Sequence, residues 1–357
     1  MKRHRILTYI AFALSSNSVY TVFTKSWLAL SLVILTLPVA QGCSKHDHPQ
    51  DSDFTEVLSR SSVKIAVRHS EEAGIRSLDA FVFNDDALRR IDCYQRTGET
   101  DGSGLLIGSC SGSKIVLLCA NAPWEKKSWE DVCSFTKASS IKVDLEDEDM
   151  EFPVMSAITC IEAGKPSEMR IERLTSEVGL RSVRCDFTGK PYEGEEITEA
   201  KAYLINVNGT CSIAPDDNEP MERIINHGSL IQDDITRFIN FCPVADSIGT
   251  IKFSHTYPGI RLLCYPNTSR EESIGTPFTR LVIEGKIQGE TWYWPINVNR
   301  DCGSGHEGIE RNRKYVYDIT LRSKGTKDPD IPIIPEMAET IFETERWKEK
   351  EPYHVAF

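Results

Sequence analysis

Short runs in which apolar and polar residues alternate dominate the chain from about residue 62 onward. Residues 62–67 place Val63, Ile65 and Val67 on one face, which is the pattern of a half-buried β-strand. Residues 314–322 show the same period over a longer run. Further strands are predicted at residues 78–83, 114–120, 168–174, 180–187, 200–206, 249–253, 259–265, 279–286 and 291–298.

Turn residues separate these strands, and helical periods do not alternate regularly with them, which favours antiparallel sandwiches over a parallel sheet. Only residues 124–136 and 221–240 have a spacing that predicts helices. A chain of 357 residues suggests about two domains, at roughly 150 residues for each. We therefore predict a mainly β protein with an N-terminal sandwich at residues 61–208 and a C-terminal sandwich at residues 209–357.

The first 42 residues have the pattern of a secretory signal. Residues 1–42 contain four basic residues and no acidic one, and they end in an apolar run at residues 27–40. This run is shorter than the roughly 20 apolar residues of a comfortable membrane-spanning helix. Gly42 and Cys43 follow, and then a polar tether that extends to residue 60. This arrangement resembles a bacterial lipoprotein signal, which implies that Cys43 is acylated and anchors the chain to outer-membrane lipid.

A plain signal peptide followed by an incidental cysteine is the alternative. The charged start also lies unusually far upstream of the apolar run, so the true start codon is open. Removing residues 1–42 changes the formal net charge from −12 to −16. An acidic chain with no basic run after residue 5 is a poor ligand for nucleic acid, because phosphate affinity comes from clustered Lys and Arg.

The ten cysteines that remain besides Cys43 allow disulfides in an exported chain, but their spacing does not fix any pairing. Cys119 lies in an apolar strand, where a buried thiol is an equally good interpretation. No CxxC pair, phosphate-binding loop, HExxH or GxSxG motif is present. The acidic run at residues 144–149 lacks the spacing of an EF-hand. We expect no metal, no cofactor and no enzyme activity.

A family resemblance rests mainly on residues 310–321, which read ERNRKYVYDITL, and on residues 325–330, which read GTKDPD. These residues contain, in order, an Arg-Asn turn, an alternating Tyr-rich strand and a loop that runs from a Gly to an Asp-Pro pair. Together with residues 75–84, 152–156 and 280–296, this order resembles the fimbrillins, the major-fimbrial-subunit superfamily of Bacteroidales that builds type V pili. The resemblance implies two transthyretin-like β-sandwich domains in tandem after a lipoprotein signal.

The resemblance also implies assembly by strand exchange. In such pilins an N-terminal strand fills a groove in the first domain until a trypsin-like protease cuts after an arginine. Here the displaced strand would carry Val63, Ile65 and Val67, and the candidate cleavage sites follow Arg68 and Arg76. An emptied groove exposes apolar surface and unpaired backbone groups, so an added strand restores both packing and hydrogen bonds.

The incoming strand would come from the C-terminal segment of another subunit. We place this donor within residues 338–347, with Ile341, Phe342 and Trp347 as its apolar residues, in a C-terminal segment that covers residues 338–357. The alternative is that these three side chains simply pack on their own domain.

These features predict a structural subunit of a cell-surface pilus, located at the bacterial outer membrane and in the fimbrium, which contributes to adhesion. Its partners would be other pilus subunits, and a host glycan or protein is a further candidate. The short connection at residues 69–75 favours an uncut anchor, although stalk and tip roles stay open. The alternative is a monomeric surface lipoprotein that binds glycan, with Trp292, Tyr293 and Trp294 as a stacking platform. A secreted hydrolase is a third hypothesis without nominated residues.

Overall fold

The computed structural model describes residues 64–70, 72–97, 112–124, 129, 131–165, 167–214, 221–225, 245–273, 275–300, 308–348 and 353–356. The predicted signal at residues 1–42, the lipidation site Cys43, the tether and Val63 lie outside these residues. Residues Glu56–Phe357 form one compact unit by their contacts.

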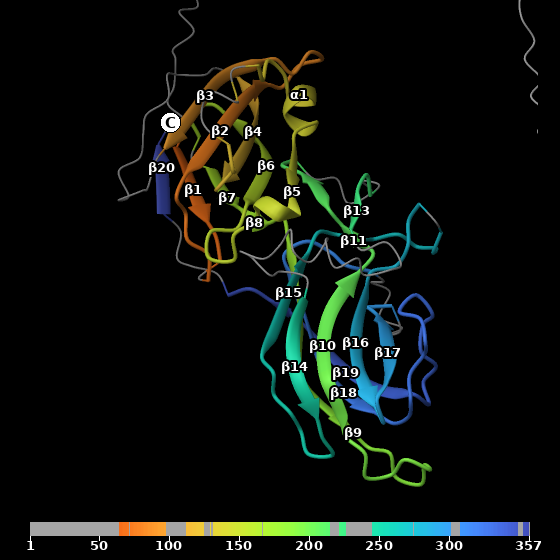
Figure 1. Cartoon of the computed structure of the whole chain (residues 1–357). Helices are drawn as coiled ribbons and strands as arrows, with labels where there is room; N and C mark the ends of the chain where they lie inside the picture. Colours follow the sequence, from red (N-terminus) through yellow and green to blue (C-terminus); the bar gives the residue numbers. More distant parts are fainter. Residues whose placement is uncertain are drawn as a thin grey trace, which may run out of the picture. The chain divides into compact units, whose positions relative to one another are not determined.

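The first group of strands builds two layers (Figure 1). One layer is an antiparallel five-stranded sheet in the order β3-β2-β4-β6-β8. Its strands are β2 (Leu78–Asn84), β3 (Ile91–Thr97), β4 (Ser113–Ala120), β6 (Met155–Glu162) and β8 (Glu172–Arg173). The other layer has the order β20-β1-β7 and consists of β1 (Lys64–Arg68), β7 (Ser167–Arg170) and β20 (Tyr353–Ala356).

Strand β4 is apolar along almost its whole length because both of its faces are covered. Val116 and Leu118 face the layer of β1 and join an apolar cluster with Ile65 and Val67. Leu117 belongs to the cluster on the opposite face. A continuous apolar run is the pattern expected for a strand buried on both faces.

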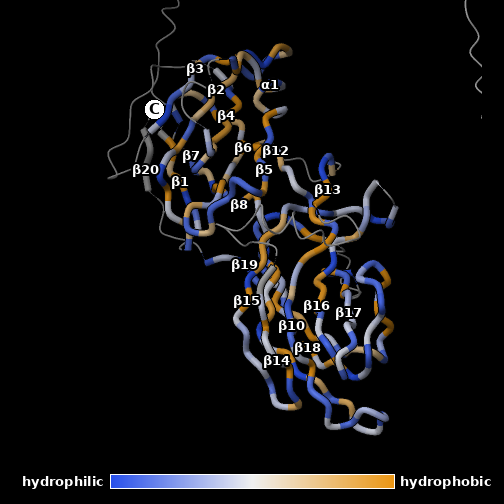
Figure 2. Tube along the Cα trace, in the orientation of Figure 1, coloured by the Kyte–Doolittle hydropathy of each residue, from blue (hydrophilic) through white to orange (hydrophobic). Residues whose placement is uncertain are grey.

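The second group of strands forms a sandwich of two four-stranded sheets, in the orders β14-β10-β16-β17 and β15-β9-β18-β19. The first sheet contains β10 (Ile197–Ile205), β14 (Ala245–Ile251), β16 (Arg280–Ile287) and β17 (Glu290–Asn297). The second contains β9 (Ser176–Cys185), β15 (Ile260–Cys264), β18 (Arg313–Leu321) and β19 (Ala338–Arg346). Apolar and polar residues follow one another along these strands, as the colours in Figure 2 show.

Strand β18 confirms the alternation predicted from the sequence, since its four apolar residues at every second position are 0–1% exposed. They pack in one cluster with inward-facing residues of β10 and β16. The prediction of a mainly β fold with sandwich layers is thus confirmed. Two neighbouring pairs, β1 with β7 and β9 with β18, are parallel, which the sequence analysis did not foresee.

Short elements complete the described structure. They are α1 (Phe135–Ser139), β5 (Lys142–Asp144), η2 (Leu145–Asp147), β11 (Val207–Asn208), β12 (Thr210–Ser212) and β13 (Ile224–Ile225). Strand β5 pairs with β12, and β11 pairs with β13. The helix predicted at residues 124–136 is wrong in its described part, because residues 131–134 are not helical and only residues 135 and 136 belong to α1, which follows the Ser134 cap. Residues 224–225 form a strand, and most of the second predicted helix lies outside the described residues.

Sheet membership changes between β8 and β9 along the chain. Strands β9 and β10 pair only with strands of the second group, β15, β18, β14 and β16. Strand β12 then returns to pair with β5. The alternation of residues predicts each strand but does not specify its partner.

The seven cysteines that the structure describes all carry free thiols. Cys119, Cys185, Cys211 and Cys264 are buried, as in the buried-thiol interpretation. Among the described residues, no three His, Cys, Asp or Glu side chains gather closely enough to hold a metal ion. The same part of the chain contains no helix of the length and apolarity that a membrane span requires.

Candidate functional site

The predicted displaced strand, β1, is the central strand of its three-stranded sheet. It pairs in parallel with β7 and antiparallel with β20, and Ile65 and Val67 are 1% and 0% exposed. Both side chains fill the space over β2, β4 and β6, beside Val82, Val116 and Met169. Burying one such side chain contributes about 1.5–3 kcal/mol. Removing β1 would therefore open an apolar groove and leave one edge of β7 unpaired.

Arg68, the first candidate cleavage residue, ends β1. Its Cα faces Arg170 of β7, and its carbonyl accepts a hydrogen bond of 2.9 Å from the Ile171 amide. Its Nε lies 2.5 Å from an oxygen of Glu168. The backbone beside Arg68 is thus engaged in a sheet rather than presented as a free loop.

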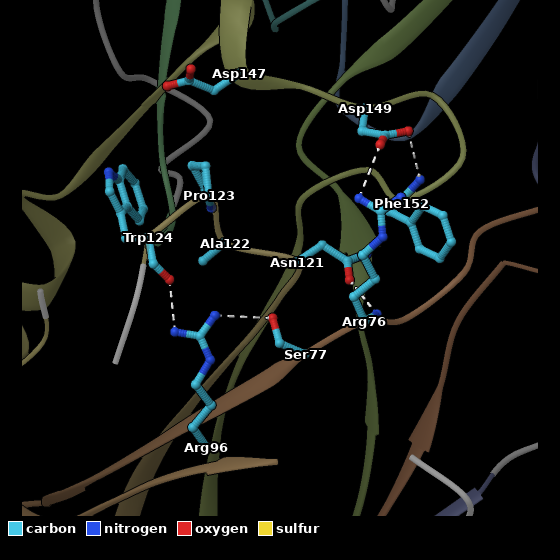
Figure 3. A pocket seen from close by; sticks show the side chains of 10 residues that line it. All are labelled: Arg76, Ser77, Arg96, Asn121, Ala122, Pro123, Trp124, Asp147, Asp149 and Phe152. Carbon is cyan, nitrogen blue, oxygen red and sulfur yellow. Dashed lines mark hydrogen bonds and ion pairs between the residues drawn. The ribbon is translucent and has the colours of Figure 1, made fainter. Parts of the chain in front are cut away.

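Arg76, the second candidate cleavage residue, lines an open depression of about 580 Å³ (Figure 3). Its backbone amide donates a 2.8 Å hydrogen bond to the side chain of Asn121. Its guanidinium lies 3.6 Å from the ring centre of Phe152, and its Nη1 lies 3.3 Å from Asp149. Three contacts therefore hold Arg76, although its side chain is 55% exposed.

The same depression contains a second arginine, Arg96, on its other side (Figure 3). Arg96 donates to the Trp124 carbonyl at 2.7 Å and to the Ser77 hydroxyl at 3.3 Å. Its Nε also lies 3.7 Å from the buried carboxylate of Asp79. Both arginines are thus already paired within the chain. Their contacts stabilise the segment at the start of β2, and we call this set of contacts the brace.

Between the two candidate cleavage residues, Glu72 contacts three cations that we call the basic cluster: Arg173, Arg261 and Lys314. Its carboxylate lies 2.9 Å from Lys314 Nζ and 3.7 Å from Arg261 Nη2. Its carbonyl accepts a 3.0 Å hydrogen bond from Arg173 Nη2. Arg173 is only 2% exposed, and burial lowers its pKa to about 10. Arg173 remains charged at neutral pH, and a buried charge is destabilising unless an acidic group lies nearby.

The predicted donor segment forms β19 and the residue that follows it. Strand β19 pairs with β18 of its own chain over its full length. Phe342 is partly buried and stacks on Tyr317 with 5.3 Å between ring centres. Ile341, by contrast, is 58% exposed. The alternative in which these side chains pack on their own domain thus describes Phe342 but not Ile341.

Trp347, the third predicted donor residue, is 4% exposed and lies within the basic cluster. Arg173 Cζ and Lys314 Nζ are each 3.7 Å from its ring centre, and Arg261 Cζ is 5.9 Å away. Cations over an indole face are attracted by the ring quadrupole. The same three cations therefore contact both the loop after β1 and the C-terminal segment.

Strand β20 brings the end of the chain back to the first strand. Its backbone pairs with β1 in the register Lys64 with Ala356 to Val67 with Tyr353, and Figure 1 shows the two strands side by side. No sequence pattern predicted β20. Glu72 and the basic cluster were not predicted either, because their residues lie far apart in the sequence and carry no local motif.

The proposed glycan platform on β17 is not an exposed surface. Trp294 is 0% exposed, and its indole donates to the Ser323 carbonyl at 2.9 Å. Trp292 is covered by the ammonium of Lys327, 3.5 Å from its ring centre. A sugar needs an open aromatic face for stacking, which the buried Trp294 does not offer, whereas Trp292 and Tyr293 are half-buried.

No family model matches the chain, and no curated protein is significantly similar to it. Among solved structures, a fimbrilin, FimA, from Porphyromonas gingivalis has a TM-score of 0.58 at 15% identity, over 82% of this chain and 99% of its own.

Two further structures are candidate cell adhesion proteins. The one from Parabacteroides distasonis has a TM-score of 0.60 at 15% identity, over 82% of this chain and 98% of its own. The one from Bacteroides eggerthii has a TM-score of 0.60 at 14% identity, with the same shares. The chain therefore has the fimbrillin-like fold. The FimA fimbrilin and the two candidate cell adhesion proteins share this fold.

Proposed function

We propose that this chain is a structural subunit of a cell-surface pilus that assembles by strand exchange and contributes to adhesion. The observation that carries the proposal is β1, a short strand whose buried Ile65 and Val67 fill a groove over the five-stranded sheet. Such a strand can be replaced by another with the same alternation without rebuilding the sheet. The fimbrillin-like fold supports the same role.

The C-terminal segment is the proposed donor, and Ile341 supports this assignment. A large apolar side chain that is 58% exposed on an edge strand does little for its own fold. Strand β19 is paired on one side only within the described residues. An apolar residue at an open edge fits a role in contact with a neighbouring subunit.

A point variant tests the donor assignment. Ile341→Asp should leave the free energy of unfolding within about 0.5 kcal/mol of wild type, because the site is exposed. It should reduce incorporation into the sheared pilus fraction of the source bacterium, since a charge would enter the groove of the neighbour. Ile334→Asp is the matched control, because Ile334 is 53% exposed but lies outside β19. Normal incorporation of the Ile341 variant would refute the donor assignment.

We further propose that Cys43 carries acyl chains that attach the chain to outer-membrane lipid. The support is the sequence around Cys43 alone. Mass spectrometry of the mature N-terminus tests it. An acylated Cys43 that is still joined to β1 in assembled pili indicates an anchor subunit, whereas an N-terminus at His69 or Ser77 indicates a processed stalk or tip subunit. A mature chain without acyl groups that begins elsewhere would contradict the assignment.

A further inference from the structure

The C-terminal segment is held in place at two points by its own chain. Strand β20 pairs with β1, and Trp347 is enclosed by the basic cluster. Both points lie next to the stretch that carries the candidate cleavage residues, since Arg68 ends β1 and Glu72 contacts the cluster. The first strand, its following loop and the end of the chain thus share contacts.

Glu72 balances the charge of the site that encloses Trp347. Without its carboxylate, Lys314 and Arg261 would lose the acidic partner that they share. Arg261 would keep its pairing with Glu177 at 2.6 Å, but Lys314 has its closest acidic partner in Glu72, at 2.9 Å. Like charges that are gathered around a buried ring without a counter-charge repel one another.

We propose that Glu72 and Trp347 form a latch, in which the loop after β1 and the C-terminal segment hold each other through the basic cluster. Opening the loop removes the Glu72 contacts from Arg173 and Lys314 and weakens the hold on Trp347. Releasing Trp347 removes the cation–π contacts of the same cations, and this weakens their hold on the loop. Closure of each end of the subunit therefore stabilises closure of the other.

The purpose of the latch rests on the proposed function. A donor segment stored on its own chain cannot enter a neighbour prematurely, and β20 covers an edge of β1 that would otherwise be open to other chains. By thermodynamic linkage, a partner that draws the C-terminal segment away also exposes the loop at residues 69–75. Donation would then promote, rather than follow, cleavage of the loop.

Amide hydrogen exchange on the full mature chain tests the first direction of the coupling. Glu72→Gln should raise the exchange rates of β19 and Trp347 on the order of three- to tenfold, because it removes the partly exposed ion pairs and keeps the backbone bond to Arg173. The matched control is Glu168→Gln, which removes the ion pair of Arg68 but does not touch the basic cluster. Unchanged exchange in the Glu72 variant, or an equal increase in the control, would overturn the latch.

Limited proteolysis with an arginine-specific protease tests the reverse direction. Trp347→Ala should speed cleavage at Arg68 or Arg76 on the order of threefold or more, while Ile341→Ala on the same segment should leave the rate unchanged. Cleavage as slow as in wild type would overturn the coupling. Neither measurement requires a pilus. If both give the expected result but the chain does not polymerise, the latch is supported and the proposed function is refuted.

Discussion

Glu148 is a fully buried carboxyl group, 3% exposed, that accepts hydrogen bonds from the Val154 amide at 3.0 Å and the Tyr265 hydroxyl at 2.9 Å. Burial raises its pKa from 4.5 to about 7 despite these bonds. Burial also raises the pKa of Asp79, from 3.8 to about 6. Single buried residues thus connect the stability of this chain to pH.

The folded state binds the extra proton, so the stability falls as the pH rises through the folded pKa. Between about pH 4.5 and 7 the native Glu148 holds more protons than the unfolded one, and we expect the free energy of unfolding to decrease from pH 5 to pH 8. In the Glu148→Gln variant, the decrease in the free energy of unfolding between pH 5 and pH 8 should be smaller than in wild type, by at most about 3 kcal/mol.

Urea unfolding at several pH values measures the effect. Glu336→Gln, which changes an exposed carboxyl group, should keep the wild-type slope. A slope that is the same in the Glu148 variant as in wild type would contradict the assignment of the proton to this residue.

Arg76 should resist proteolysis in the folded chain, because its guanidinium rests on Phe152 and its amide is bonded to Asn121. Phe152→Ala should increase the rate of cleavage after Arg76 by roughly threefold or more, since a cation–π contact contributes about 0.5–1 kcal/mol at exposed sites and the ring also packs. The fragments are identified by mass spectrometry. Phe278→Ala is the control, because it removes a similar contact with Arg300, 3.9 Å from the ring centre, elsewhere in the chain. Equal rates in both variants would argue against the brace.

At the scale of elements, β1 behaves as part of the core although it is only five residues long. Its inward side chains are as deeply buried as those of β2 and β4, on which they pack. Its outward position Ala66 is half-buried. The strand therefore contributes to stability mainly through Ile65, Val67 and its two backbone ladders.

Val67→Ala should lower the free energy of unfolding by about 2 kcal/mol, because it deletes two buried methyl groups and leaves a cavity under β1. Ala66→Ser, on the opposite face of the strand, should change it by about 0.5 kcal/mol or less. Urea titrations followed by circular dichroism measure both values. A Val67 variant as stable as wild type would mean that β1 does not fill the groove in solution.

At the scale of the whole described structure, one apolar cluster contains residues of both strand groups, such as Phe81 and Leu117 of the first and Leu281 and Tyr317 of the second. A continuous core favours a single cooperative unfolding transition. Buried thiols provide a probe in each group. Burial raises the pKa of Cys264 to about 12 and that of Cys119 well above its ordinary value, so neither reacts while folded.

Pulsed alkylation along a urea series should therefore modify Cys119 and Cys264 over the same narrow range of concentration. The exposed Cys160 should react at every concentration and serves as the internal standard. Modification of one buried thiol well before the other would show that the two strand groups unfold separately.

The β character of this protein is readable in its sequence alone, since alternation such as that of residues 315–321 records which side chains face the core. The sequence also predicted a strand at residues 62–67 with Val63, Ile65 and Val67 on one face, and a donor within residues 338–347 with Ile341, Phe342 and Trp347 as its apolar residues. These features are local, and a period of two residues is readable without knowledge of any partner.

The pairing of the strands, by contrast, is visible only in the folded chain, because hydrogen-bonded ladders join segments that are far apart in the sequence. The parallel pair β9–β18, the return of β20 to β1 and the gathering of Arg173, Arg261 and Lys314 around Trp347 have no local pattern that predicts them. The same holds for Glu72, which is an ordinary acidic residue until the fold places it beside three cations. Contacts of this kind depend on the long-range arrangement of whole elements, and a single sequence does not contain that information in a readable form.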